Sequence, residues 1–104
     1  MYGRLVEIEG IDPSRREEAL QNLRETVIPA LKGLEGFAGF ISLADEEKRR
    51  ARSIVLWETR ENAEAAERQM ASRREEMVSR LGARVRSADL YEAPIVDVRT
   101  GVAV

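Results

Sequence analysis

Residues 37–59 read FAGFISLADEEKRRARSIVLWET, and this stretch decides the fold. Its two apolar ends, 37–43 and 53–57, are rich in the aromatic and β-branched residues that favour strands. The charged segment 45–50 between them predicts the exposed tip of a β-hairpin. Thr59 follows the second strand at once and is a typical N-cap residue, so we expect a helix to begin directly after the hairpin.

The helix predicted after the hairpin ends at Gly82, because glycine is the usual residue just past a helix C-terminus. Glu61 lies in its first turn, where a negative charge meets the positive end of the helix dipole. Its apolar side chains recur at helical spacing: Ala63, Ala66, Met70, Met77, Val78 and Leu81. Residues 85–91 then predict a last strand.

The segment before the hairpin predicts one strand and one helix. Residues 2–8 form the strand, and Asp12-Pro13-Ser14 is a helix-start signal for a helix from about residue 14 to about residue 34. Pro29 lies inside this helix and removes an amide, so we expect a kink or break over 25–29. The order β-α-β-β-α-β predicts an α+β, ferredoxin-like fold, with a four-stranded antiparallel sheet and two helices on one face.

Both faces of the predicted hairpin are apolar. Simple alternation puts Phe37, Ile41 and Leu43 on one face of the first strand, and Ala38 and Phe40 on its other face. In the second strand it puts Val55 and Trp57 on one face, and Ile54 and Leu56 on the other. Two helices cover only one face, and a large exposed apolar surface is unusual for a monomer. We therefore expect a homodimer packed sheet against sheet. The apolar tail 94–104 is expected to extend an edge strand or to contact the partner.

Composition narrows the possible function classes. The 104 residues suffice for one domain, 1–104, and a net charge of −2 argues against nucleic-acid binding. The chain has no cysteine and no histidine, which removes disulfides, the usual metal ligands and His-dependent catalysis. No apolar run reaches the roughly 18–20 residues of a membrane span, and no signal peptide is evident. We expect a cytoplasmic protein that contacts neither membrane nor nucleic acid and holds no metal.

Five side chains have both a structural and a functional interpretation. Trp57 either lines a pocket for a planar ligand or anchors the sheet. The hydroxyl of Tyr91 can donate to a substrate oxygen or take part in proton transfer; in the structural interpretation it lies at the rim of the sheet. Met70 and Met77 share one helix face, where they either line an adaptable pocket or fill the core. Arg4 either holds an anion in a dry site or forms a salt bridge with a Glu at an edge or rim.

Two charged runs are interpreted as solvated surface. Residues 48–52 are mostly basic, but they follow the acidic 45–47 and contain no aromatic residue on which a base could stack. Residues 73–76, Arg-Arg-Glu-Glu, can form intrahelical pairs at spacings of three and four, as exposed helix faces do.

Four short motifs occur over nearly the whole chain: Val27-x-Pro29-x-Leu31, Gly36-Phe37-x-Gly39, Leu56-Trp57-Glu58-Thr59 leading into a helix, and Tyr91-Glu92 in the last strand. In combination and spacing they resemble the antibiotic-biosynthesis-monooxygenase-like family. The resemblance implies a dimeric α+β barrel, in which two ferredoxin-like protomers face each other with their sheets. The family's activities are diverse, so it constrains the fold more than the function.

Among the activities that the resemblance implies, haem degradation is not expected. That branch uses an Asn on the first strand, a Trp on the second helix and a His as iron ligand, whereas here the first strand has no Asn, Ala66 falls near the Trp position and no His exists. The remaining implication is oxidation of a phenol or quinol by O₂ without a cofactor.

The resemblance also implies a site for a small aromatic molecule between sheet and helices. Its ligand-binding candidates are Trp57, Phe40, Met70 and Met77, and its catalytic candidates are Tyr91 and Arg4. The alternative is a non-catalytic dimeric protein that binds a small ligand or acts as an accessory on the same fold, which the missing His and Asn favour.

Overall fold

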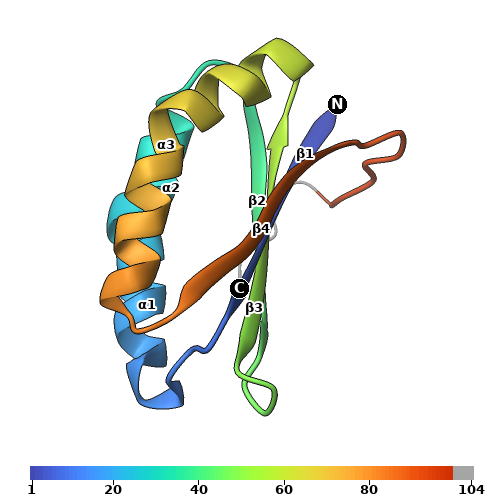
Figure 1. Ribbon diagram of the computed structural model, residues 1–104. Coiled ribbons are helices and arrows are strands. Elements are labelled where there is room, and N and C mark those ends of the chain that lie inside the picture. Colours follow the sequence, from blue (N-terminus) through green and yellow to red (C-terminus); the bar gives the residue numbers. More distant parts are fainter. Residues whose placement is uncertain (100–104) are drawn as a thin grey trace.

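The computed structural model describes residues 1–99, which form one four-stranded antiparallel sheet with a helix layer on one side (Figure 1). In chain order the elements are β1 (Tyr2–Glu9), the 3-10 turn η1 (Pro13–Arg15), α1 (Arg16–Asn22), the π-helical turn η2 (Leu23–Val27), α2 (Ile28–Lys32), β2 (Phe37–Asp45), β3 (Arg50–Trp57), α3 (Arg60–Arg80) and β4 (Arg84–Glu92). The strands lie in the order β2-β3-β1-β4, with β1 and β3 in the centre. The predicted ferredoxin-like α+β fold is confirmed.

The first helical segment is continuous but changes its geometry just before Pro29. The N–H of Ile28 donates to the C=O of Leu23, five residues back, which defines the wide turn η2. Proline has no N–H, and its ring crowds the carbonyl four residues earlier, so regular α-helical bonding cannot pass through this position. The disturbance expected over 25–29 therefore occurs over 23–27, as a widening of the helix.

A β-bulge at the start of β2 changes the predicted side-chain pattern. Phe37 lies opposite Trp57, but Gly39 lies opposite the next residue, Leu56, so Ala38 is an extra residue in the strand. A bulge of this kind shifts the alternation by one position. Phe37 therefore packs on the helix-covered face, and the prediction from simple alternation, which put it on the same face as Ile41 and Leu43, is wrong.

The core is centred on Trp57, which is 2% exposed. Its ring meets that of Phe37 edge to face, with centroids 6.0 Å apart and an interplanar angle of 82°. Ala63 and Ala66 of α3 are buried in the same cluster, together with Leu31 of α2 and Val55 of β3. The small alanine side chains let α3 pack closely on the sheet at this end of the molecule.

Gly36 lets the chain pass close to the start of α3. Its φ is +82°, and a Cβ at this position would lie 2.2 Å from the side-chain oxygen of Asn62. Thr59 is the N-cap, as predicted, and its hydroxyl oxygen accepts a hydrogen bond from the Asn62 N–H at 3.0 Å. Only glycine combines this backbone angle with this contact.

The face of the sheet away from the helices is also apolar, and we call it the open face. Its apolar side chains are Leu5 of β1, Ile41 and Leu43 of β2, Ile54 and Leu56 of β3, and Tyr91 of β4. Leu43 is 50% and Tyr91 53% exposed. The expected second apolar face is therefore present.

The chain after β4 runs along the side of the sheet opposite the helices (Figure 1). The N–H of Ala93 donates to the Met1 C=O at 2.9 Å, after which residues 94–99 form no strand. Ile95 and Val98 line a depression of about 410 Å³ on the open face. Residues 94–99 thus do not extend the edge strand, and the rest of the predicted tail, 100–104, lies outside the described residues. Among the helices of residues 1–99, none is both long and apolar enough to cross a membrane.

Candidate ligand-binding site

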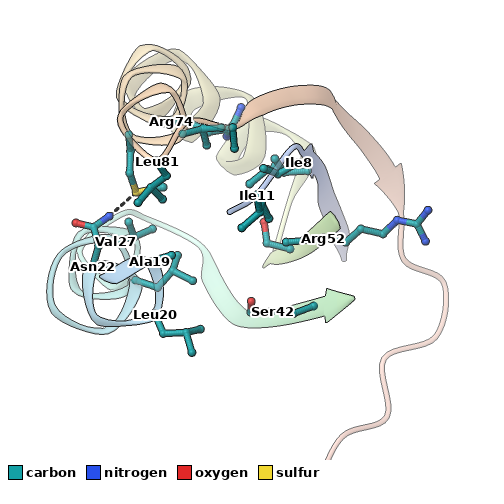
Figure 2. Close-up of a pocket in the computed structure, with 18 of the residues that line it drawn as sticks. Ile8, Ile11, Ala19, Leu20, Asn22, Val27, Ser42, Arg52, Arg74 and Leu81 are labelled. Carbon is teal, nitrogen blue, oxygen red and sulfur yellow. Dashed lines mark hydrogen bonds between the residues drawn. The ribbon is translucent and has the colours of Figure 1, made fainter. Parts of the chain in front are cut away.

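A cavity of about 420 Å³ lies between the helix layer and the sheet (Figure 2). Small-molecule sites in proteins commonly occupy roughly 300–1,000 Å³. Most of the lining is apolar and comes from both helical segments and from the sheet: Val6, Ile8, Leu20, Leu23, Val27, Leu31, Phe40, Val55, Met70, Met77, Val78 and Leu81.

The cavity exists because side-chain size changes along the helix-covered face of the sheet. At the end near Trp57, large side chains fill the space between the layers. Toward the hairpin tip the same face carries small residues, with Ser42 opposite Ser53 and Ala44 opposite Ala51. All four of these line the cavity. The helices lie over this half of the sheet too, so the missing side-chain volume leaves an open space.

The widened turn η2 borders this space. Leu23, Thr26 and Val27 from this turn line the cavity. At its edge the side-chain amide of Asn22 donates to the sulfur of Met77, which links the first helical segment to α3 (Figure 2). π-Helical turns occur frequently at functional sites, which agrees with this position.

An ionic cluster lies between α3 and the central strand β1, and we call it the Glu67 cluster. Glu67 accepts two hydrogen bonds from the guanidinium of Arg74, at 3.0 and 2.5 Å. The Nε atom of Arg4 lies 3.7 Å from the same carboxylate, and its Nη1 donates to the Ala88 C=O at 3.1 Å. The three side chains are mostly buried, at 12% exposed for Arg4, 26% for Glu67 and 17% for Arg74.

The surroundings keep Glu67 ionised. The hydrogen bond from Arg74 lowers the pKa of Glu67; burial opposes this shift, and the charges of Arg74 and Arg4 add to it. Two guanidinium groups therefore share one carboxylate, which leaves the cluster with a net positive charge. Arg74 also lines the cavity, where Figure 2 shows its side chain extending from α3 toward the sheet.

The open end of the cavity is framed by the loop before α1 and by the β2–β3 hairpin. The Nε–H of Arg49 donates to the Ile11 C=O at 2.8 Å, and Arg16 lies 4.0 Å from Glu46. Both contacts join residues far apart in the sequence. They hold the hairpin tip against the start of the first helical segment.

The structure brings three of the predicted ligand-binding residues together. Phe40 of β2 and Met70 and Met77 of α3 all line the cavity. Trp57 does not line the cavity and lies in the core beside Phe37. Of its two interpretations, pocket wall or anchor of the sheet, the structure thus favours the anchor.

The two predicted catalytic residues lie on opposite faces of the sheet. Arg4 is paired in register with Val55 and faces the helices, whereas Tyr91 is paired with Gly3 and lies on the open face. Arg4 does form a salt bridge with a Glu, but on a central strand and not at an edge. A single site in which the Tyr91 hydroxyl and the Arg4 guanidinium both contact the substrate is thus not assembled within one protomer.

Arg74 and Glu67 are the site residues that the sequence interpretation missed. The interpretation of residues 73–76 as an exposed face is wrong for Arg74, because its side chain turns inward and binds Glu67 seven residues earlier. The signal was the gap in the apolar stripe of α3 between Met70 and Met77. An arginine occupies the helix face where that stripe predicts an apolar residue.

Within residues 1–99, no three or more acidic side chains gather in an arrangement that could hold a metal ion.

Comparison with known proteins identifies the fold. No protein-family model matches the sequence, and no curated protein matches it either. Two solved structures are similar over most of their length. One is a dimeric ferredoxin-like protein from an uncultured marine organism, with a TM-score of 0.68, 10% identity, and coverage of 95% of this chain and 100% of that chain.

The second is a monooxygenase from the gene ActVA-Orf6 of Streptomyces coelicolor in complex with Nanaomycin D. It has a TM-score of 0.66 and 15% identity, and the match covers 95% of this chain and 92% of that chain. At these identities the likeness establishes the shared ferredoxin-like fold.

Proposed function

We propose that this protein binds a small, largely apolar or aromatic molecule in the cavity between the helices and the sheet. The observation that carries the proposal is the cavity itself, about 420 Å³ with a mainly apolar lining. Flexible thioethers of Met70 and Met77 suit an adaptable binding wall. The similar fold of a monooxygenase whose structure contains the ligand Nanaomycin D also supports small-molecule binding.

Binding is tested by calorimetric titration of the purified protein with 2-naphthamide, a neutral two-ring aromatic probe, together with native mass spectrometry of the protein as isolated. Saturable binding of one probe molecule per chain supports the proposal. Absence of heat change at millimolar probe, together with a native mass equal to that of the chain alone or of its simple multiples, contradicts it.

The more specific proposal is an antibiotic-biosynthesis-monooxygenase-like oxygenase that needs no cofactor. In such a reaction a phenol and O₂ give a quinone and water: one oxygen atom enters the ring, the other leaves as water, and the substrate supplies the four electrons. The chain's contribution would be to exclude water and to stabilise the phenolate by the positive charge of the Glu67 cluster.

Oxygen uptake with phenol and hydroquinone substrates tests this activity. A lower rate of oxygen uptake in the Arg4→Ala variant supports a role for Arg4 in holding the anion. A lower rate in the Tyr91→Phe variant supports a role for the Tyr91 hydroxyl in proton transfer. A rate unchanged by either substitution removes the corresponding role.

The alternative is a binding or accessory protein without catalysis, and one observation favours it. Tyr91, the candidate for proton transfer, lies on the opposite face of the sheet from the cavity. This alternative predicts retained ligand without oxygen consumption. Substrate turnover coupled to oxygen uptake contradicts it.

We also propose a homodimer that packs through the open faces of two sheets, as in a dimeric α+β barrel. The exposed Ile41, Leu43 and Tyr91 supply the apolar surface, and the similar ferredoxin-like protein is described as dimeric. In such a dimer Tyr91 of each protomer lies in the space between the sheets. Native mass spectrometry that shows twice the chain mass supports this arrangement, and a monomer at micromolar concentration contradicts it.

A further inference from the structure

We infer that the ligand of this cavity is an anion: an apolar or aromatic body that carries one acidic group, a carboxylate or a phenolate, bound on the Arg74 side of the cavity. The inference rests on the proposed binding function and specifies its ligand class. It is drawn from the charge and hydrogen-bonding balance of the Glu67 cluster.

The charge of the cluster is unbalanced in a mostly buried place. Arg4, Glu67 and Arg74 are each no more than 26% exposed in their side chains. Arginine stays protonated in proteins, and Glu67 is ionised, so the cluster carries one excess positive charge. Both arginines share the one carboxylate, and an excess charge in a mostly buried place is costly, so an anion beside the cluster lowers that cost.

Arg74 also has hydrogen-bond donors left for a ligand. A guanidinium has five N–H groups, and two bonds from Arg74 go to Glu67. These are the two side-chain hydrogen bonds that Arg74 makes among residues 1–99, and no side-chain N or O atom there is fully buried without a partner, so its other donors are open to the cavity or to solvent. Because Arg74 is a lining residue, its remaining donors are available to an acidic group in the cavity.

The other charged groups of the lining do not oppose an anion. The acidic residues there are three, Asp45, Glu46 and Glu76, against seven arginines, of which Arg52 lies on the open face and pairs with Glu7 at 3.4 Å. Glu76 binds Arg80 at 2.6 Å, Glu46 lies 4.0 Å from Arg16, and Asp45 accepts a hydrogen bond from the Lys48 N–H. Two of the three acidic groups are thus paired with arginines and Asp45 is held by a backbone N–H, so positive charge remains in excess and attracts anions toward the cavity.

The test compares two probes of nearly equal shape, 2-naphthoate and 2-naphthamide, by calorimetry at neutral pH. Wild-type protein is expected to bind the carboxylate roughly 10- to 100-fold more tightly than the amide, the usual contribution of a charged hydrogen bond. Arg74→Met makes the cluster neutral and should abolish this preference, so that the two probes bind with nearly equal affinity. Glu67→Gln raises the cluster charge and frees Arg74, so it should strengthen naphthoate binding further.

Two control variants isolate the role of Arg74. Arg74→Lys keeps the charge and should keep most of the preference. Arg68→Met removes an exposed arginine from the same helix and should leave both affinities as in the wild type. Circular dichroism of each variant verifies that it is folded.

The outcomes separate this inference from the proposed function. Equal binding of both probes to the wild type, or a preference that survives in Arg74→Met, overturns the anionic ligand class and leaves an apolar binding site intact. If neither probe binds, the binding function itself fails and the inference falls with it.

Discussion

Filling the cavity should stabilise the protein and block its ligand. Ser53 faces the cavity from the central strand β3 and lies opposite Ser42 of β2. Ser53→Leu adds three carbon atoms and removes one hydroxyl. At about 0.8 kcal/mol per buried CH₂, burying these carbon atoms stabilises the folded state by about 2 kcal/mol. Ordering the leucine side chain costs about 0.5–1 kcal/mol of this, so the expected net stabilisation is about 1–1.5 kcal/mol.

Thermal unfolding and probe titration measure the two effects together. A stabilisation of that size raises the Tm of a domain this small by about 4–10 °C. The affinity for 2-naphthamide should fall at least about tenfold, since the leucine occupies space that the ring needs. Ser72→Leu, at an exposed position of α3, is the matched control and should change stability by no more than about 0.5 kcal/mol and leave binding unchanged.

Two results would refute this reasoning. If Ser53→Leu lowers the free energy of unfolding by more than about 1 kcal/mol, the position is already tightly packed, because overpacking a full core is destabilising. Stabilisation with unchanged probe affinity means that the ligand binds elsewhere.

Three further predictions concern the dimer, the core and the ionic cluster. Leu43→Asp puts a charge on the open face and should convert a dimer into a folded monomer in sedimentation velocity; a variant that remains dimeric contradicts sheet-to-sheet packing. Gly36→Ala should lower the free energy of unfolding by about 2–4 kcal/mol in urea denaturation, because it adds a left-handed backbone penalty of about 1–2 kcal/mol and displaces the capping region at Asn62; a loss below about 0.5 kcal/mol is the opposing outcome. Glu67 has a lowered pKa, so its stabilising contribution is complete above its ordinary value of 4.5 and is lost as the pH falls through the folded-state pKa. The difference in unfolding free energy between wild type and Glu67→Gln should therefore shrink below about pH 4.5, and a difference independent of pH speaks against the ion pairs.

The secondary structure was largely predictable because it depends on local signals. Most element boundaries are marked by local signals: runs of strand-forming residues, the Thr59 cap, and the glycines at 36 and 82. The spacing of hydrophobic residues predicts which face of each helix is buried. The disturbance at Pro29 was also predictable, since the missing amide is a property of the residue itself. Its form, a π-helical turn, depends on how the chain packs on the sheet.

The site was less predictable because it depends on strand register and on missing volume. One extra residue at Ala38 reverses the face of Phe37, and the only local sign of it is the neighbouring Gly39, since a glycine inside a strand often marks a bulge. Arg4 and Tyr91 can meet only if β1 and β4 turn these two residues to the same face of the sheet. The register between the two strands decides this, and it is not visible in either strand alone. Small residues such as Ser42 and Ser53 could have revealed the cavity once they were assigned to the helix-covered face.

The inward arginine illustrates a related difficulty. Charge pairs at spacings of three and four suggest that residues 73–76 are exposed, but Arg74 finds its partner two helical turns earlier, at Glu67. Local pairing rules describe an isolated helix, whereas burial against the sheet selects the longer contact.

The most direct test of the central claim is methyl NMR of the methionines during titration with 2-naphthamide. The chain has three methionines, of which Met70 and Met77 line the cavity and Met1 is 48% exposed at the end of the chain. Met70→Leu and Met77→Leu variants assign the signals. Binding in the cavity predicts that ring currents of the probe shift the methyl signals of Met70 and Met77 and leave that of Met1 in place. Saturating probe that leaves both Met70 and Met77 unshifted contradicts a ligand site between the helices and the sheet.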